Sequence, residues 1–370
     1  MKYYIIAGEA SGDLHGSNLI KALKTKDEEA DIRCWGGDLM QQAGGTLVKH
    51  YKEQAFMGFL EVIFNLRTIF KNIAFCKTDI QKFQPHIIIF IDYSGFNLRI
   101  AKWAKEQQFK THYYISPQIW ASRENRIQRI KRDIDSMSVI LPFEKSFYED
   151  KHQFPVRFVG HPLIDAIATG PKVDKTTFLS ENGIDPNKPI IALLPGSRKQ
   201  EVGKMLAVML SLVERFPNYS FVIAGAPSLE NNFYTSYLTN TNVGFVANKT
   251  YELLQVAYAA LVTSGTATLE TALFNVPQVV CYKGNWLSYQ IAKRIITLKY
   301  ISLVNLIMDK EVVKELIQDD LNTPNLTQEL TKIIDPLHRK LLLEAYGALQ
   351  QKLGGEGASV KTAAHIKENL

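Results

Sequence analysis

The sequence predicts an α/β protein built from two doubly wound domains in tandem, with helices at the carboxyl end. Three observations support this fold class. Strand-length apolar runs alternate with helix-length segments, the alternation stops near Asp165 and then restarts, and only helical periodicity remains after Leu326. The chain has 370 residues, of which 46% are hydrophobic, so it is long enough for two separate cores.

Strands in the first half are indicated by runs that are apolar almost throughout, such as HIIIFID. Such runs are typical of parallel strands that are covered on both faces. Helix-length segments, for example residues 12–24 and 96–107, separate them. The predicted strands are Lys2–Gly8, Asp31–Trp35, His86–Asp92, Thr111–Ser116, Ser138–Leu141 and Arg157–Gly160.

A boundary follows, because ATGPKVDKTT and NGIDPNKP combine proline, glycine and charge. Strands and helices then alternate again. Since ligands of such sheets bind beyond the carboxyl ends of the strands, the residues that follow each strand are the first candidates for a site. The predicted strands of the second half are Pro189–Leu194, Ser220–Ala224, Gly244–Ala247, Ala259–Thr263 and Pro277–Tyr282.

Composition limits the function classes. A net charge of +6, from 43 basic and 37 acidic side chains, favours anionic partners but is too dispersed to indicate nucleic acid. Phosphorylated small molecules and anionic lipid both stay open. The three cysteines are far apart in apolar segments, which predicts core residues in a reducing compartment and no disulfide framework. We expect neither a signal peptide nor a membrane-spanning segment.

The first strand ends in Gly8-Glu9-Ala10-Ser11-Gly12-Asp13-Leu14-His15-Gly16. The glycine spacing matches neither G-x-G-x-x-G nor a P-loop. One interpretation is a tight turn in which Ser11 or Asp13 caps a helix. The other is a glycine-lined floor for a ligand, faced by Glu9, Asp13 and His15; a surface position for His15 also stays open.

Asp92 directly follows the run IIIFI, so it is expected where the apolar sheet meets solvent. Partial burial there would raise the pKa of its carboxyl into the range of a general base. The alternative is that Asp92 caps the helix beginning near Phe96. Only the first interpretation predicts loss of chemistry in Asp92→Asn.

The most basic stretch runs from Arg123 to Arg132, within SPQIWASRENRIQRIKRD. It fits a solvated helical face, or a site for an anionic substrate or membrane phosphates. Asp133 and Asp135 form a D-x-D pattern that holds metals in other enzymes. Because they follow five cations, we expect them to pair with neighbours and predict no metal site.

Two strand ends of the second half indicate an anion site. Arg198 follows LLPGS, and Ser264-Gly265-Thr266 precedes a predicted helix whose first turn exposes unpaired N–H groups. Glu270, about one turn into that helix, would reach ribose hydroxyls. Capping and a surface position are the plainer alternatives, but together these residues suggest a site for a nucleotide diphosphate.

Residues 55–77, AFMGFLEVIFNLRTIFKNIAFCK, are apolar around more of a helix than a surface position needs. A helix buried between layers is one interpretation. The other is that part of it docks on a bilayer or lines an acyl groove, with Arg67 and Lys71 meeting anionic headgroups. His161, between a strand end and Pro162, is expected to fix a turn.

These motifs occur in an order that resembles lipid-A-disaccharide synthases, and the resemblance covers nearly the whole chain. One departure is Ser94, where that family often has proline, which leaves open the geometry just after Asp92. The matching stretches are GEASGDLHG, FMGFLEV (56–62), IDYSGFN (91–97), SPQIWASR (116–123), LPFEKSFY (141–148), FVGHPL (158–163), LLPGSRKQEV (193–202), SGTATLE (264–270), YISLVNLI (300–307) and KELIQDD (314–320).

The resemblance implies an inverting, metal-independent glycosyltransferase of the GT-B type, with two Rossmann-like domains facing a cleft. Domains are expected at residues 1–168, joined by the C-terminal helices 337–370, and at residues 186–336. The implied reaction joins UDP-2,3-diacylglucosamine to 2,3-diacylglucosamine 1-phosphate, giving a β(1→6) lipid A disaccharide and UDP. No cofactor is implied, because the UDP-sugar is a substrate.

The resemblance also implies roles for single residues and a location. Asp92 would be the base, and Glu9 and Asp13 would be further catalytic residues. The enzyme would lie in the cytoplasm on the inner-membrane surface. A homodimer stays open. Rival functions are another UDP-sugar GT-B transferase and a non-catalytic nucleotide- or lipid-binding protein. The residues implied in binding are Ser11, Gly12, Arg198, Ser264, Gly265, Thr266, Glu270, Asn305 and Gln318.

Overall fold

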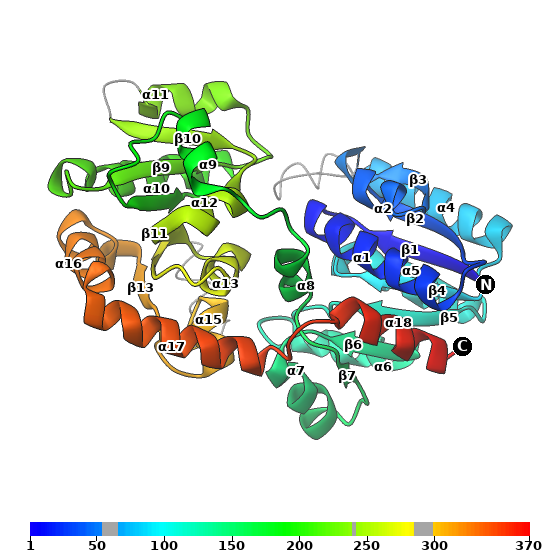
Figure 1. Cartoon of the computed structure of the whole chain (residues 1–370). Helices are drawn as coiled ribbons and strands as arrows, with labels where there is room; N and C mark the ends of the chain where they lie inside the picture. Colours follow the sequence, from blue (N-terminus) through cyan, green and yellow to red (C-terminus); the bar gives the residue numbers. More distant parts are fainter. Residues whose placement is uncertain (54–65, 239–241, 285–298) are drawn as a thin grey trace. The chain divides into compact units, whose positions relative to one another are not determined.

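The computed structural model of the chain describes residues 1–53, 66–238, 242–284 and 299–370. The chain divides into two compact units (Figure 1). The first unit contains Met1–Ala168 and Leu353–Leu370, and the second contains Thr169–Lys352. The long helix α17 (Pro336–Lys352) therefore belongs to the second unit, and the expectation that all of residues 337–370 join the first was wrong for this helix.

The first unit, over its described residues, is a seven-stranded parallel sheet in the order β3-β2-β1-β4-β5-β6-β7. The strand order reverses between β1 and β4, which makes this pair the topological switch point. The strands β1 and β4 are almost fully buried, as their apolar runs predict. The strand β5, KTHYY, is also buried after Lys110 although it carries polar side chains. The strands are β1 (Lys2–Ala7), β2 (Asp31–Gly36), β3 (Thr46–His50), β4 (Ile87–Ile91), β5 (Lys110–Tyr114), β6 (Ser136–Val139) and β7 (Arg157–Phe158).

Helices cover this sheet, and the last one comes from the end of the chain (Figure 1). Helix α18 (Ala358–Glu368) packs against α1 and α8. Asp165 accepts hydrogen bonds from the N–H groups of Gly357 at 2.6 Å and Ser359 at 3.2 Å, which fixes the start of α18. The other helices are α1 (Ala10–Lys26), α2 (Asp38–Gln42), α4 (Leu66–Phe83), α5 (Ser94–Glu106), α6 (Ile127–Asp133), α7 (Pro142–Ser146) and α8 (Pro162–Ala168).

The second unit contains, among its described residues, a six-stranded parallel sheet in the order β10-β9-β8-β11-β12-β13. Its switch point lies between β8 and β11. Apolar side chains of these strands and of the helices beside them form a separate core. The strands are β8 (Ile190–Leu194), β9 (Ser220–Gly225), β10 (Val243–Ala247), β11 (Ala257–Thr263), β12 (Gln278–Tyr282) and β13 (Lys314–Ile317).

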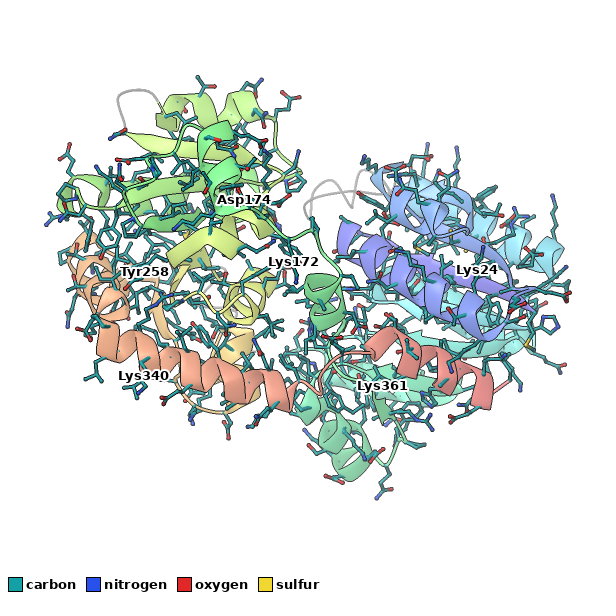
Figure 2. The ribbon with its side chains drawn as sticks, viewed as in Figure 1. Lys24, Lys172, Asp174, Tyr258, Lys340 and Lys361 are labelled. Atoms are coloured by element: carbon teal, nitrogen blue, oxygen red, sulfur yellow. The ribbon has the colours of Figure 1, made fainter. Side chains whose placement is uncertain are left out.

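Helices of the second unit begin at the predicted linker. Asp174, labelled in Figure 2, accepts a hydrogen bond from the N–H of Thr177 at 2.8 Å and so caps α9. Arg339 of α17 stacks over the ring of Tyr258, with 4.2 Å between guanidinium and ring centre. The helices are α9 (Lys175–Glu181), α10 (Lys199–Leu210), α11 (Thr235–Leu238), α12 (Thr250–Val256), α13 (Thr266–Leu273), α15 (Leu303–Met308), α16 (Thr323–Ile334) and α17.

The predicted fold class is confirmed: both sheets are parallel and helices end the chain. Two edge strands, β3 and β13, were missed, because TLVKH and KELI are short and carry charge. The three cysteines are free and buried, as expected. In the described ranges, no helix has both the length and the apolar character needed to cross a bilayer.

Candidate functional site

Two loops meet at the switch point of the first sheet. Strands β1 and β4 are paired, with Ala7 opposite Ile91, so Gly8 and Asp92 leave the sheet side by side. The ring of Tyr93 packs over Gly8: a Cβ at position 8 would lie 2.3 Å from Tyr93 Cγ. Gly8 is therefore required for close contact between the two loops.

The backbone of Asp92 is held in an uncommon conformation. Asp92 and Tyr93 both have φ of 45°, in the left-handed region. The Asp92 carbonyl accepts hydrogen bonds from Tyr113 Oη at 2.5 Å and Asn97 Nδ2 at 2.8 Å. Tyr93, and not Asp92, is the N-cap residue of α5, so the interpretation of Asp92 as a helix cap is wrong.

The electrostatic environment of Asp92 suits a base. Burial, followed by the negative charge of Glu9, raises the pKa of Asp92 to about 6. Glu9 is exposed at the N-cap of α1, close enough for its charge to act on Asp92. A carboxylate with this pKa is mostly ionised at neutral pH and still basic enough to accept a proton.

Asp13 has a structural role instead of the predicted catalytic one. Its side chain is 4% exposed. Oδ1 accepts hydrogen bonds from the N–H groups of Gly37 at 2.8 Å and Met40 at 2.9 Å, and Oδ2 accepts from Leu39 at 3.1 Å. These three bonds cap α2, so the carboxylate fixes α1 against α2.

Ser11 and Gly12 lie in the first turn of α1, beside Glu9. Ser11 is exposed. Gly12 is buried, and a Cβ there would come within 3.0 Å of the Ala7 Cβ, so the glycine lets the helix approach β1. The interpretation that Ser11 caps α1 is wrong, because the cap residue is Glu9.

His15 and His161 are both buried, and a positive charge on His15 would lower the pKa of His161. Burial lowers the pKa of His15 to about 4 and that of His161 to about 3. His161 Nδ1 accepts from the N–H of Leu163 at 3.2 Å, which confirms its predicted role in a turn. The surface position considered for His15 is wrong.

The switch point of the second sheet brings the predicted nucleotide residues to one edge. Strands β8 and β11 are paired, with Leu194 opposite Val262, so Arg198 and Thr266 follow neighbouring strands. Arg198 is exposed at the N-cap of α10, and Gly265 is the N-cap of α13. Two helix N-termini and a guanidinium thus lie at the same edge, which is a favourable environment for an anion.

Ser264 and Glu270 have partners within the second unit. Ser264 Oγ donates to the carbonyl of Ile301 at 3.0 Å. Tyr251 Oη donates to Glu270 Oε1 at 3.1 Å, and burial raises the pKa of Glu270. These contacts hold both side chains near the start of α13.

Asn305 does not fit the predicted binding role. It is fully buried, its Nδ2 donates to Val313 O at 2.8 Å and Glu315 Oε1 at 2.9 Å, and its Oδ1 accepts from the N–H groups of Val312 and Val313. These bonds join α15 to the start of β13 and leave nothing for a ligand. Gln318 differs: its Nε2 is buried without a hydrogen-bond partner among the described residues.

The D-x-D acids pair with cations, as predicted. Arg132 Nε lies 2.6 Å from Asp133 Oδ1, and Lys105 pairs with Asp135. Across the described ranges, no three His, Cys, Asp or Glu side chains are grouped so that they could hold a metal ion.

Sequence reasoning missed the partners that organise the first site. Tyr113 and Asn97 fix the backbone of Asp92, and buried Glu144 accepts from Ser116 Oγ at 2.6 Å. No local pattern marks Tyr113, since it is one of two adjacent tyrosines in the buried strand β5. Polar residues inside apolar segments were the available signal for Asn97 and Glu144.

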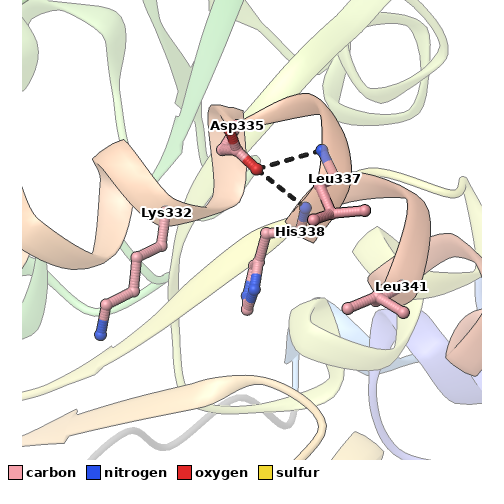
Figure 3. Close-up of a pocket in the computed structure, with 5 residues that line it drawn as sticks. All are labelled: Lys332, Asp335, Leu337, His338 and Leu341. Atoms are coloured by element: carbon pink, nitrogen blue, oxygen red, sulfur yellow. Dashed lines mark hydrogen bonds between the residues drawn. The ribbon is translucent and has the colours of Figure 1, made fainter.

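A pocket of about 300 Å³ lies at the junction of α16 and α17 (Figure 3). Asp335 Oδ1 accepts from the N–H groups of Leu337 and His338, both at 3.0 Å, and so caps α17. None of the predicted site residues lines this pocket, which we assign to helix capping.

Comparison with known proteins identifies the family. Residues 3–356 match the family model described as lipid-A-disaccharide synthetase. A lipid-A-disaccharide synthase of Geobacter metallireducens is 38% identical over 99% of this chain and 96% of the relative. One of Coxiella burnetii is 35% identical over 99% of this chain and 97% of the relative.

Solved structures share the fold at low identity. A Staphylococcus aureus MnaA–UDP structure matches with a TM-score of 0.72 and 16% identity, over 99% of this chain and 96% of the other. UDP-GlcNAc 2-epimerase of Neisseria meningitidis bound to UDP-GlcNAc matches with a TM-score of 0.67 and 14% identity, over 100% and 98%. By its sequence, this chain belongs to the lipid-A-disaccharide synthase family of glycosyltransferases.

Proposed function

We propose that this enzyme transfers diacylglucosamine from UDP-2,3-diacylglucosamine to the 6-hydroxyl of 2,3-diacylglucosamine 1-phosphate, with inversion and release of UDP. Family membership supports a glycosyltransferase of lipid A biosynthesis. The observation that carries the mechanism is Asp92, a half-buried carboxylate with a pKa of about 6 at the switch point of the first sheet.

Asp92 removes the proton of the acceptor hydroxyl as the new glycosidic bond forms. A primary alcohol is a weak nucleophile at neutral pH, and a positioned base contributes about 10²- to 10⁴-fold. Inversion in one displacement needs one base and no covalent intermediate. Glu9 keeps the Asp92 carboxylate basic, and Tyr113 and Asn97 hold its backbone in place.

The second unit holds the departing UDP. Negative charge gathers on the pyrophosphate as the bond breaks, and Arg198 with the N-terminus of α13 stabilises that charge. Arginine suits this position because its planar guanidinium binds two phosphate oxygens at once. Glu270 binds ribose, and the free Nε2 of Gln318 donates to the nucleotide.

The acyl chains require contact with a lipid surface, and α4 supplies an exposed face for it. Ile73, Cys76 and Ile80 pack into the core, as one interpretation of this helix expected. Phe70, on the same helix, is 63% exposed and lies next to Lys71 in the chain. We therefore propose peripheral binding of α4 to the inner membrane; residues 55–65 of the predicted segment lie outside the described residues.

One assay tests this function. Labelled UDP-2,3-diacylglucosamine is incubated with 2,3-diacylglucosamine 1-phosphate, and the disaccharide is measured for the wild type and for Asp92→Asn. We expect product only from the wild type. Equal product from both proteins contradicts Asp92 as the base, and product from an unacylated donor at the same rate indicates a different UDP-sugar transferase.

A further inference from the structure

A second pocket, of about 260 Å³, lies in the first unit. Ser94 lines it and is two residues from Asp92, so their Cα atoms are within about 7 Å. The described residues that line the pocket are Ser94, Pro117, Gln118, Ile119, Ser122, Arg123 and Arg126.

The pocket is strongly cationic. Arg126 is partly buried, and its pKa is lowered by burial and then by the charges of Arg123 and Arg129, with a smaller effect of Arg99. Glu124, the acid in this stretch, pairs with Lys151 at 2.7 Å and His152 at 2.9 Å, so its charge is neutralised away from Arg126. Crowded guanidinium groups repel one another, and a bound anion relieves that repulsion.

The pocket is also rigidly built. Arg126 Nη1 donates to Ser94 Oγ at 3.2 Å. Tyr148 Oη donates to the carbonyl of Pro117, another lining residue, at 3.1 Å. Glu144, 1% exposed, accepts hydrogen bonds from Ser116 Oγ and Trp120 Nε1, on either side of Pro117–Ile119 in the chain. Arg126 and Ser94 are therefore held together before a ligand arrives.

We propose that this pocket binds the phosphate monoester of the acceptor, with Arg123 and Arg126 as the charged ligands and Ser94 and Ser122 as hydroxyl donors. The assignment rests on the proposed function for the identity of the acceptor. A volume of about 260 Å³ is below the usual range for a whole drug-sized ligand, so it suits a headgroup and leaves the acyl chains outside.

The geometry links this pocket to the chemistry. Arg126 and Asp92 both affect the pKa of Tyr113, whose hydroxyl also bonds to the Asp92 carbonyl. A phosphate held at Arg126 would place the sugar ring beside Asp92, with the hydroxyl at the far end of the ring toward the base. Phosphate binding thus acts as a positioning device for the reacting hydroxyl.

Binding of glucosamine 1-phosphate, which is soluble and unacylated, tests the pocket without turnover. By calorimetry we expect Arg126→Gln and Arg123→Gln each to weaken this binding by about ten- to a hundredfold. Lys131→Gln, which removes an exposed charge from the following helix α6, should bind as the wild type does. Equal binding by wild type and both arginine variants, or no binding by the wild type, overturns the proposal.

Three further experiments distinguish the phosphate of the acceptor from inorganic phosphate and from the phosphates of a membrane. Inorganic phosphate should bind more weakly than glucosamine 1-phosphate. Vesicles containing anionic lipid should bind Arg126→Gln and the wild type equally. If Arg126→Gln loses vesicle binding, the arginines bind membrane phosphates and the proposed acceptor site is overturned. In turnover, Arg126→Gln should raise KM for the phosphorylated acceptor and leave a dephosphorylated acceptor unaffected. If the wild type binds glucosamine 1-phosphate through Arg126 but makes no disaccharide, the proposed function fails and the pocket stands.

Discussion

The charge of Glu9 reaches the carboxylate of Asp92 across two paired strands and raises its pKa. Burial has the larger effect, and the two together bring the pKa to about 6. The exposed carboxylate of Glu9 therefore raises the pKa of the half-buried carboxylate of Asp92.

The first prediction concerns Glu9→Gln. Because the substitution removes a negative charge, the pKa of Asp92 should fall, and the acid limb of kcat/KM should move to lower pH. The profile is measured from pH 4.5 to 8. Glu29→Gln, an exposed acid of the same unit, serves as the control and should leave the limb in place. If the acid limb of kcat/KM stays at the same pH in Glu9→Gln, the charge of Glu9 does not set the pKa of Asp92.

The second prediction is that Asp92→Asn loses turnover about 10²- to 10⁴-fold and gains stability above pH 6. The folded-state pKa of about 6 lies above the ordinary 3.8, so the stabilising effect of the protonated form is fully present below pH 3.8 and is lost as pH rises from 3.8 through 6. Asparagine stays neutral and tolerates a φ of 45°. At pH 8 the gain should approach about 2–3 kcal/mol. Urea unfolding at pH 5 and pH 8 measures it, and a less stable variant at pH 8 refutes it.

The third prediction separates Asp13 from catalysis. Asp13→Asn replaces one acceptor oxygen with an NH₂ group facing backbone N–H donors, which should lower the free energy of unfolding by about 2–4 kcal/mol. The acid limb of the pH profile should stay where it is. Asp38→Asn, an exposed acid in the first turn of α2, is the control and should change stability little. A shifted limb with unchanged stability would restore a catalytic role to Asp13.

The fourth prediction concerns the nucleotide. Arg198→Ala should weaken UDP binding about ten- to a hundredfold. Arg198→Lys should recover part of the loss, because lysine keeps the positive charge but lacks the planar guanidinium that binds two phosphate oxygens. Calorimetry with UDP measures both. Lys204→Ala, also exposed on α10, should bind UDP normally. If Arg198→Ala binds UDP as tightly as Lys204→Ala does, the nucleotide site lies elsewhere.

The fifth prediction tests α4 as a membrane contact. Phe70→Ser should reduce binding to vesicles of anionic phospholipid about tenfold, because an exposed aromatic side chain no longer enters the interface. Val360→Ser changes a side chain that is 53% exposed on α18 and should leave vesicle binding unchanged. Sedimentation with vesicles measures both variants. Indistinguishable binding by all three proteins would remove α4 from the interface.

The sequence predicted the sheet interiors well because buried parallel strands such as β4 are apolar throughout. It also predicted which residues follow the strands at both switch points. It could not tell a ligand-binding polar residue from a structural one. Asn305 and Asp13 looked like site residues, yet the side chains of both form hydrogen bonds with backbone groups. That distinction depends on contacts between segments far apart in the chain.

Ser94 shows the same limit at a finer scale. It is the first residue of α5, a position where proline is also favoured, so the departure from the family pattern preserves the start of the helix. The hydroxyl adds a contact that proline lacks, with Arg126. Only the folded arrangement of residues 94 and 126 reveals that contact.

The return of α18 to the first unit has a consequence for biosynthesis. The second unit is one continuous segment, Thr169–Lys352, whereas the first unit includes the final residues, Leu353–Leu370. On the ribosome the inserted segment is complete before α18 has been made. The surface of the amino-terminal sheet that α18 covers therefore stays exposed until α18 itself has been translated.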